Sequence, residues 1–185
     1  MIDPGDEPAE ILAIARDMGV RITRVLASHA HLDHIMAARD IVEATGAPFL
    51  LHQADLPIAD NMPDSARAWL GRQVSPAPTP DAFAADGDDL EVAGVTLTVL
   101  HTPGHTPGSV SLYAREASLL FSGDTLFRES IGRTDLPGGD YAQIARSIAE
   151  RLYALPEDTR VLPGHMRETT IGHERNHNPF VRSGR

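Results

Sequence analysis

The segment 28–34 (SHAHLDH) concentrates side chains that bind metal ions: His29, His31, Asp33 and His34. Neutral imidazoles and carboxylates are typical ligands of zinc and similar ions. Each of these groups needs a partner when it leaves water, because an unpaired buried charge is costly. The segment directly follows the apolar run Val25-Leu26-Ala27, so a short strand would carry the four side chains at its end. The spacing therefore predicts a metal site.

Three later residues fit the same pattern. His105 lies in residues 101–108 (HTPGHTPG), Asp124 in residues 121–127 (FSGDTLF), and His165 in residues 162–165 (LPGH). In each case an apolar strand is expected to run into a glycine-containing turn, which glycine's backbone freedom allows, and then to present one imidazole or carboxylate. Functional side chains on loops held by a rigid scaffold are a common way to build a site.

Each motif alone has an ordinary alternative. The segment from His29 to His34 would fit a solvated loop, and Asp124 a turn-capping aspartate. Their combination in one order favours metal binding. Trp69 is predicted to be a core residue. The remaining histidines are interpreted as structural or surface residues: His52, His101, His173 and His177.

The elements that would position these residues alternate between strand and helix, which predicts an α/β protein. Helices are expected over residues 8–18, 35–44, 64–74 and 141–155. Strands are expected over residues 21–27, 48–52, 90–92, 95–100, 110–113, 119–121 and 160–162. Residues 90–100 would form a hairpin, and the proline-rich residues 75–80 a loop.

Length and composition predict one domain over residues 1–185, with an ordinary hydrophobic content of 42%. No apolar run approaches the roughly 20 residues that span a membrane, and the N-terminus lacks the features of a secretory signal. The chain has no cysteine, so disulfides and thiolate ligands are excluded, and a cytoplasmic location is expected. The net charge of −10 argues against nucleic acid and anionic membranes as partners.

The ordered motifs resemble the metallo-β-lactamase superfamily, and within it the single-domain glyoxalase II branch, the hydroxyacylglutathione hydrolases. Supporting segments are residues 102–108 (TPGHTPG), 123–127 (GDTLF), 132–135 (GRTD), 174–175 (ER) and 178–180 (NPF). The resemblance implies an αββα sandwich with metals at one edge. The strand pair that usually precedes the position of residues 3–5 is expected to be missing here.

By this resemblance, two metal ions would be bound. The first would be held by His29, His31 and His105, and the second by Asp33, His34 and His165, with Asp124 bridging them. Zinc is the expected metal, with iron or manganese as alternatives. Such ions lie about 3.5–4 Å apart and share a hydroxide, and zinc lowers the pKa of bound water toward about 7. Asp33 would hold one metal and orient the nucleophile.

The implied activity is hydrolysis of a small-molecule thioester, such as S-D-lactoylglutathione, by a metal-bound hydroxide. Two-domain relatives place tyrosines where this chain has Asp135 and Arg167. Arg133 therefore stays as a candidate partner for a substrate carboxylate, with an ion pair to Asp135 as its alternative role.

Two alternatives to thioester hydrolysis stay open. The first is an oxidoreductase resembling persulfide dioxygenases, with one iron on His29, His105 and Asp124. The second is an inactive, truncated relative. The sequence does not determine the oligomeric state.

Overall fold

The computed structural model describes residues 1–182, and their contacts divide the chain into a first unit, residues 1–84, and a second unit, residues 85–185. The expectation of a single domain over the whole length stays a prediction. Within residues 1–182, no helix combines the length and apolar character needed to cross a bilayer.

The first unit is built on a sheet of three parallel strands, in the order β1 (Val25–Leu26), β2 (Phe49–Leu51) and β3 (Ala82–Phe83). Strands β1 and β2 are wholly buried, as expected for short apolar runs inside a parallel sheet. The first strand is shorter than the expected 21–27. Residues 1–3 run beside it, because Leu26 donates to the Met1 carbonyl and Asp3 donates to the Leu26 carbonyl.

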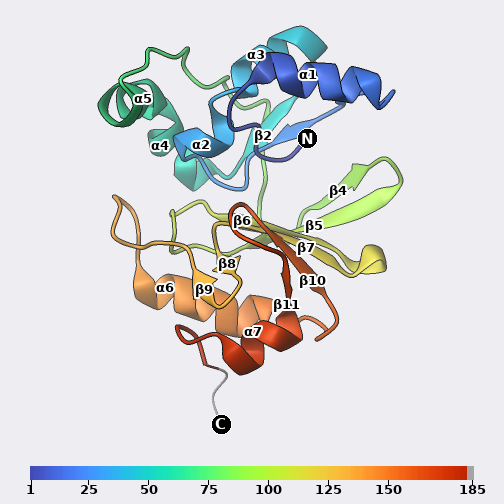
Figure 1. Cartoon of the computed structure of the whole chain (residues 1–185), viewed down its shortest axis with the longest axis vertical. Helices are drawn as coiled ribbons and strands as arrows, with labels where there is room; N and C mark the ends of the chain where they lie inside the picture. The colour runs from blue at the N-terminus through green and yellow to red at the C-terminus, as the bar shows by residue number, and fades with distance from the viewer. Residues whose placement is uncertain (183–185) are drawn as a thin grey trace. The chain divides into compact units, whose positions relative to one another are not determined.

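The helices of the first unit pack on this sheet, with α1 and α3 side by side (Figure 1). Helix α3 ends at Gly46, whose left-handed φ of 69° provides the C-cap. The elements are α1 (Pro8–Asp17), α2 (Leu32–Ile35), α3 (Ala38–Thr45), the 3-10 turn η1 (Gln53–Asp55), α4 (Leu56–Asp60) and α5 (Met62–Leu70). The short helices α2 and α4 were not expected, because they are too brief to show a periodic pattern.

The prediction that Trp69 belongs to the core is wrong, since Trp69 is 66% exposed. Helix α5 buries Met62 and Ala66 but ends at Leu70, before the expected residue 74. Gly71 then turns the chain with a φ of 63°. Trp69 therefore lies in the last turn, beyond the buried part of the helix.

The second unit is built on a six-stranded sheet in the order β11-β10-β7-β6-β5-β4. Strands β7 and β10 are parallel, and the other neighbours are antiparallel. The strands are β4 (Asp89–Val92), β5 (Val95–His101), β6 (Val110–Ala114), β7 (Leu119–Gly123), β10 (Arg160–Pro163) and β11 (Thr169–Thr170). The 3-10 turn η2 (Arg115–Ala117) joins β6 to β7, and β8 (Leu126–Phe127) pairs with β9 (Ser130–Ile131) as a separate hairpin.

One long helical segment covers this sheet: α6 (Tyr141–Arg146) continues as the π-helical η3 (Ser147–Leu152). The predicted helix over 141–155 is thus correct in position, although its second half has wider turns. Ile144, Ile148 and Leu152 are fully buried and form a core with α7 (Ile171–His177). Figure 1 shows α6 and α7 next to each other.

Candidate metal centre

Each of the four predicted ligand-bearing loops does follow a strand. His29 comes after β1, His105 after β5, Asp124 directly after β7, and His165 after β10. Each of these strands is held by backbone pairing with its neighbours in a sheet, so the loops leave from defined points. This arrangement is what the glycine-containing turns predicted.

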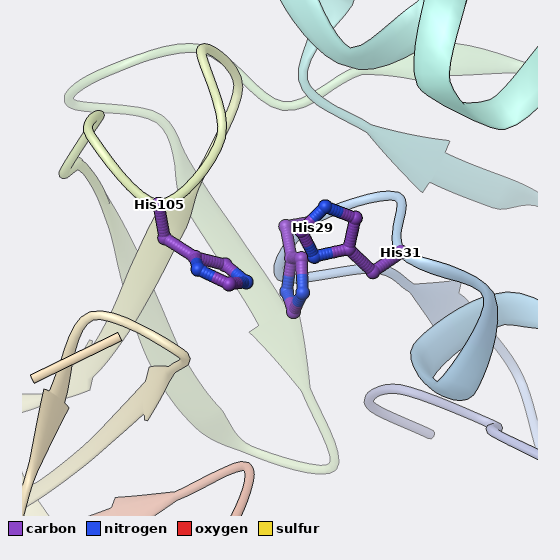
Figure 2. A group of neighbouring side chains, drawn as sticks. All are labelled: His29, His31 and His105. Carbon is purple, nitrogen blue, oxygen red and sulfur yellow. The ribbon is translucent and has the colours of Figure 1, made fainter. Parts of the chain in front are cut away.

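The first unit gathers all four of its predicted ligands within a few residues of β1. The ring centroids of His29 and His31 lie 4.9 Å apart and nearly perpendicular, and those of His29 and His34 lie 4.1 Å apart. Figure 2 shows the His29 and His31 rings on their loop, and His105 on the loop that follows β5. Asp33 Oδ2 lies 3.8 Å from His34 Nε2. His34 is buried, whereas the Asp33 side chain is 52% exposed.

Asp3, which sequence reasoning did not single out, orients two of these imidazoles. Its Oδ2 lies 3.0 Å from His34 Nδ1 and accepts a 2.7 Å hydrogen bond from Ser28 Oγ. Ser28 Oγ in turn lies 3.1 Å from His29 Nδ1, and Asp3 Oδ1 accepts from the Ser28 backbone N–H at 2.6 Å. This network assigns the proton to Nδ1 in both rings, so that Nε2 carries the lone pair that a metal requires.

Two backbone contacts hold this loop in place. The fully buried Asp55 accepts a 2.9 Å hydrogen bond from the Ala30 backbone N–H. Gly5 packs so closely that a Cβ there would collide with the Asp33 carbonyl oxygen. Gly5 thus packs directly against the segment that carries the predicted ligands. The sequence Asp3-Pro4-Gly5 is the signal that could have revealed this contact.

In the second unit, Asp124 is the centre of the predicted ligands. Its Oδ2 lies 3.7 Å from His105 Nε2 and 3.6 Å from His165 Nε2. Two atoms that each lie about 2.0–2.1 Å from one zinc ion are separated by at most about 4 Å, so both separations suit a shared ion. One carboxylate oxygen that faces two imidazoles is what a bridging ligand requires. Asp124 and His105 are buried, and the His165 side chain is 51% exposed.

The His105 ring is oriented by the backbone of the loop after β9. His105 Nδ1 lies 2.8 Å from the Arg133 carbonyl oxygen, to which it donates, so Nε2 is again the nitrogen that would bind a metal. Gly132 makes this approach feasible, because a Cβ there would collide with the Asp124 carbonyl oxygen and lie 3.1 Å from His105 Nδ1. A backbone acceptor has no sequence signature, so this contact could not be predicted.

Helix α7 and the residue that follows it hold the β8–β9 hairpin, which leads into this loop. The fully buried Glu174 accepts from the Glu129 backbone N–H at 2.9 Å, from Thr169 Oγ1 at 2.6 Å and from Asn178 Nδ2 at 2.9 Å. Asn178 Nδ2 also donates to the Ser130 carbonyl at 3.0 Å. Both bonds to the β8–β9 hairpin are thus made by residues of the 174–180 segment, which explains why that segment accompanies the ligand motifs.

The side chain of Arg133 pairs with Asp135. Its Nε and Nη2 donate to the two carboxylate oxygens at 2.7 and 2.8 Å, and the Arg133 side chain is 53% exposed. The hydrogen bond from Arg133 lowers the pKa of Asp135 to about 2. Of the two roles predicted for Arg133, the structure shows the ion pair with Asp135.

The histidines predicted to be structural do make structural contacts. His101 Nε2 lies 2.9 Å from the Pro107 carbonyl, and His52 Nδ1 accepts from the Ala54 N–H at 3.3 Å. His173 Nε2 lies 2.9 Å from Glu129 Oε1, and its ring stacks on that of His177.

Comparison with known proteins identifies the family. The family model described as the metallo-β-lactamase superfamily matches residues 1–165. The chain belongs to this superfamily. Its mixed α/β structure is the metallo-β-lactamase fold, which confirms the predicted fold class. A crystal structure of TTHA1623 in a di-iron-bound form matches with a TM-score of 0.89 and 44% identity, over 97% of this chain and 88% of that one.

Curated relatives of the superfamily narrow the class of activity. The probable metallo-hydrolase YqgX of Bacillus subtilis is 40% identical over 98% of this chain and 86% of the relative. The hydroxyacylglutathione hydrolase GloC of Haemophilus influenzae is 35% identical over 99% and 87%. The metallo-β-lactamase superfamily binds divalent metals, and this member is by class a metal-dependent hydrolase.

Proposed function

We propose that this protein hydrolyses thioesters, such as S-D-lactoylglutathione, with two divalent metal ions. The first ion would be held by His29, His31 and His105, the second by Asp33, His34 and His165, and Asp124 would bridge them. The observation that carries the proposal is the approach of Asp124 Oδ2 to both His105 and His165. The 35% identity to GloC supports the thioester as substrate.

The donor set fits zinc, iron or manganese, since it consists of imidazoles and carboxylates without a thiolate. When bound, such ions polarise a carbonyl and lower the pKa of water, which supplies a nucleophile at neutral pH. The reaction adds water across the acyl–sulfur bond, giving a carboxylate and a thiol.

The chain's own residues would perform three tasks in this reaction. Asp33, whose carboxylate is half exposed beside His34, would accept a hydrogen bond from the attacking water and orient it. Asp3, Ser28 and the Arg133 carbonyl accept hydrogen bonds from Nδ1 of His34, His29 and His105, respectively, and thereby fix the directions of their Nε2 atoms. The guanidinium of Arg133, which is paired with Asp135, is the candidate contact for the thiol part of the substrate.

The test is hydrolysis of S-D-lactoylglutathione by purified protein of known metal content, compared with His31→Ala. Loss of one ligand is expected to lower kcat/KM at least about a hundredfold, because metal catalysis contributes several kcal/mol. His177→Ala, which removes an exposed histidine of α7, is the matched control and should keep full activity.

Three outcomes would contradict the proposal. Full activity in His31→Ala would exclude the metal-dependent mechanism. About one iron per chain, with oxygen uptake on glutathione persulfide, would favour the dioxygenase activity instead. Absence of metal binding would favour an inactive relative.

A further inference from the structure

Arg133 makes two contacts through different parts of the residue. Its backbone carbonyl accepts from His105 Nδ1, which places the residue directly beside a predicted metal ligand. Its guanidinium donates in a two-point arrangement to Asp135. The guanidinium of a residue whose backbone contacts a predicted ligand is thus already paired with a carboxylate of the same loop.

This two-point arrangement is the one that a substrate carboxylate would seek. A guanidinium binds carboxylates best through two parallel N–H donors, and Asp135 engages both Nε and Nη2. An anionic substrate must therefore displace Asp135 from these two donors or bind to the other N–H groups of the guanidinium. The displacement is feasible, because exposed ion pairs contribute little to stability and both side chains are more than half exposed.

We propose that Asp135 is a specificity-determining residue, which reduces the preference of this hydrolase for thioesters whose thiol part carries a carboxylate. The inference rests on the proposed thioester hydrolysis and adds the charge class of the thiol. By neutralising Arg133, Asp135 allows thioesters of uncharged thiols to compete with those of anionic thiols. The net charge of −10 acts in the same direction at longer range, because it repels anionic substrates.

The experiment compares two substrates that share one acyl group. S-D-lactoylglutathione carries carboxylates on its thiol part, and S-D-lactoyl-N-acetylcysteamine carries none. The readout is the ratio of kcat/KM for the anionic to the neutral thioester. In Asp135→Asn this ratio should rise about two- to fivefold, mainly through a lower KM for the anionic substrate, which is the range that an exposed ion pair provides. The rise should shrink in high salt.

Two further variants isolate the cause. Arg133→Gln combined with Asp135→Asn should show no rise over Arg133→Gln alone, because the guanidinium that attracts the substrate is gone. Glu116→Gln removes the same charge from an exposed position in η2 and should leave the ratio unchanged.

The outcomes separate the two proposals. An unchanged ratio in Asp135→Asn, in an enzyme that cleaves both thioesters, would overturn the role of Asp135 and leave thioester hydrolysis intact. An equal rise in Glu116→Gln would also overturn the role of Asp135, since net charge alone would then explain the effect. Failure of the wild-type protein to cleave either thioester would overturn the proposed function, and the role of Asp135 with it.

Discussion

Three of the candidate ligands are oriented by residues outside the predicted ligand set. Asp3 and Ser28 serve His34 and His29, and the Arg133 carbonyl serves His105. That His29, His34 and His105 bind metal stays a prediction. The sequence made this prediction because the spacing of these residues is a local pattern. It did not predict these acceptors, because Asp3 lies 25 residues from Ser28 and a carbonyl belongs to every residue.

Asp3→Ala is expected to weaken metal binding about 10- to 100-fold, as loss of such supporting partners commonly does. The physical reason is that His34 Nδ1 and Ser28 Oγ both lose their acceptor. Asp3→Asn keeps one carbonyl oxygen, so its metal affinity should fall between those of the wild type and Asp3→Ala. A metal-binding titration measures the effect.

The matched control for Asp3 is Asp17→Ala, which removes an exposed carboxylate at the end of α1. Equal metal affinity in Asp3→Ala and Asp17→Ala would show that the imidazoles keep their orientation without Asp3.

At the scale of elements, the β8–β9 hairpin links helix α7 to the candidate ligand His105. Glu174 and Asn178 bind the hairpin backbone at Glu129 and Ser130, and the chain then passes Gly132 to reach Arg133. The hairpin and α7 were not expected, since two-residue strands and a polar seven-residue helix show no periodic pattern. The longer strands β5, β6 and β7 were predicted because they are rich in apolar and β-branched residues.

Gly132→Ala should damage the second unit's ligand set. The added methyl group meets the Asp124 carbonyl oxygen and the His105 ring, so the loop must move. Forced packing of this kind costs about 1–3 kcal/mol. We expect a lower melting temperature and less bound metal, measured by calorimetry and elemental analysis.

Arg128→Ala is the control for Gly132→Ala, since it changes an exposed residue in the turn of the same hairpin. If Gly132→Ala matched Arg128→Ala in both measurements, the close approach at Gly132 would have no role in holding His105.

At the scale of the whole molecule, the α/β class and the order of the ligand loops followed from the sequence, whereas the sheet order did not. Strand β10 pairs with β7 in parallel although about 40 residues separate them, and such long-range pairing has no local signal. The division into two units was likewise not expected.

Stability at alkaline pH should depend on Tyr153. Burial, with the nearby Glu174 charge, raises the pKa of this hydroxyl, which donates to the carbonyls of Glu174 and Val181 at 3.1 and 3.0 Å. The unfolded chain therefore loses this proton first, near pH 10, so the free energy of unfolding should fall as pH rises above about 10. The sequence contains no lysine, so few other groups titrate there.

Urea unfolding between pH 8 and 11 measures this dependence. Tyr153→Phe should be less stable at pH 8 but lose less stability on going to pH 11. Tyr141→Phe, at a position that is 52% exposed, should keep the wild-type slope. An unaltered slope in Tyr153→Phe would assign the alkaline loss to other groups.

The separation of backbone and side chain at Arg133 has a consequence for how such enzymes diverge. The carbonyl that orients His105 is present whatever amino acid occupies position 133, whereas Gly132 admits no side chain. Natural variation at positions 133 and 135 can therefore change which substrates are accepted while the orientation of the His105 imidazole stays the same. A lineage can explore new substrates at these two positions without first passing through a form that has lost its metal.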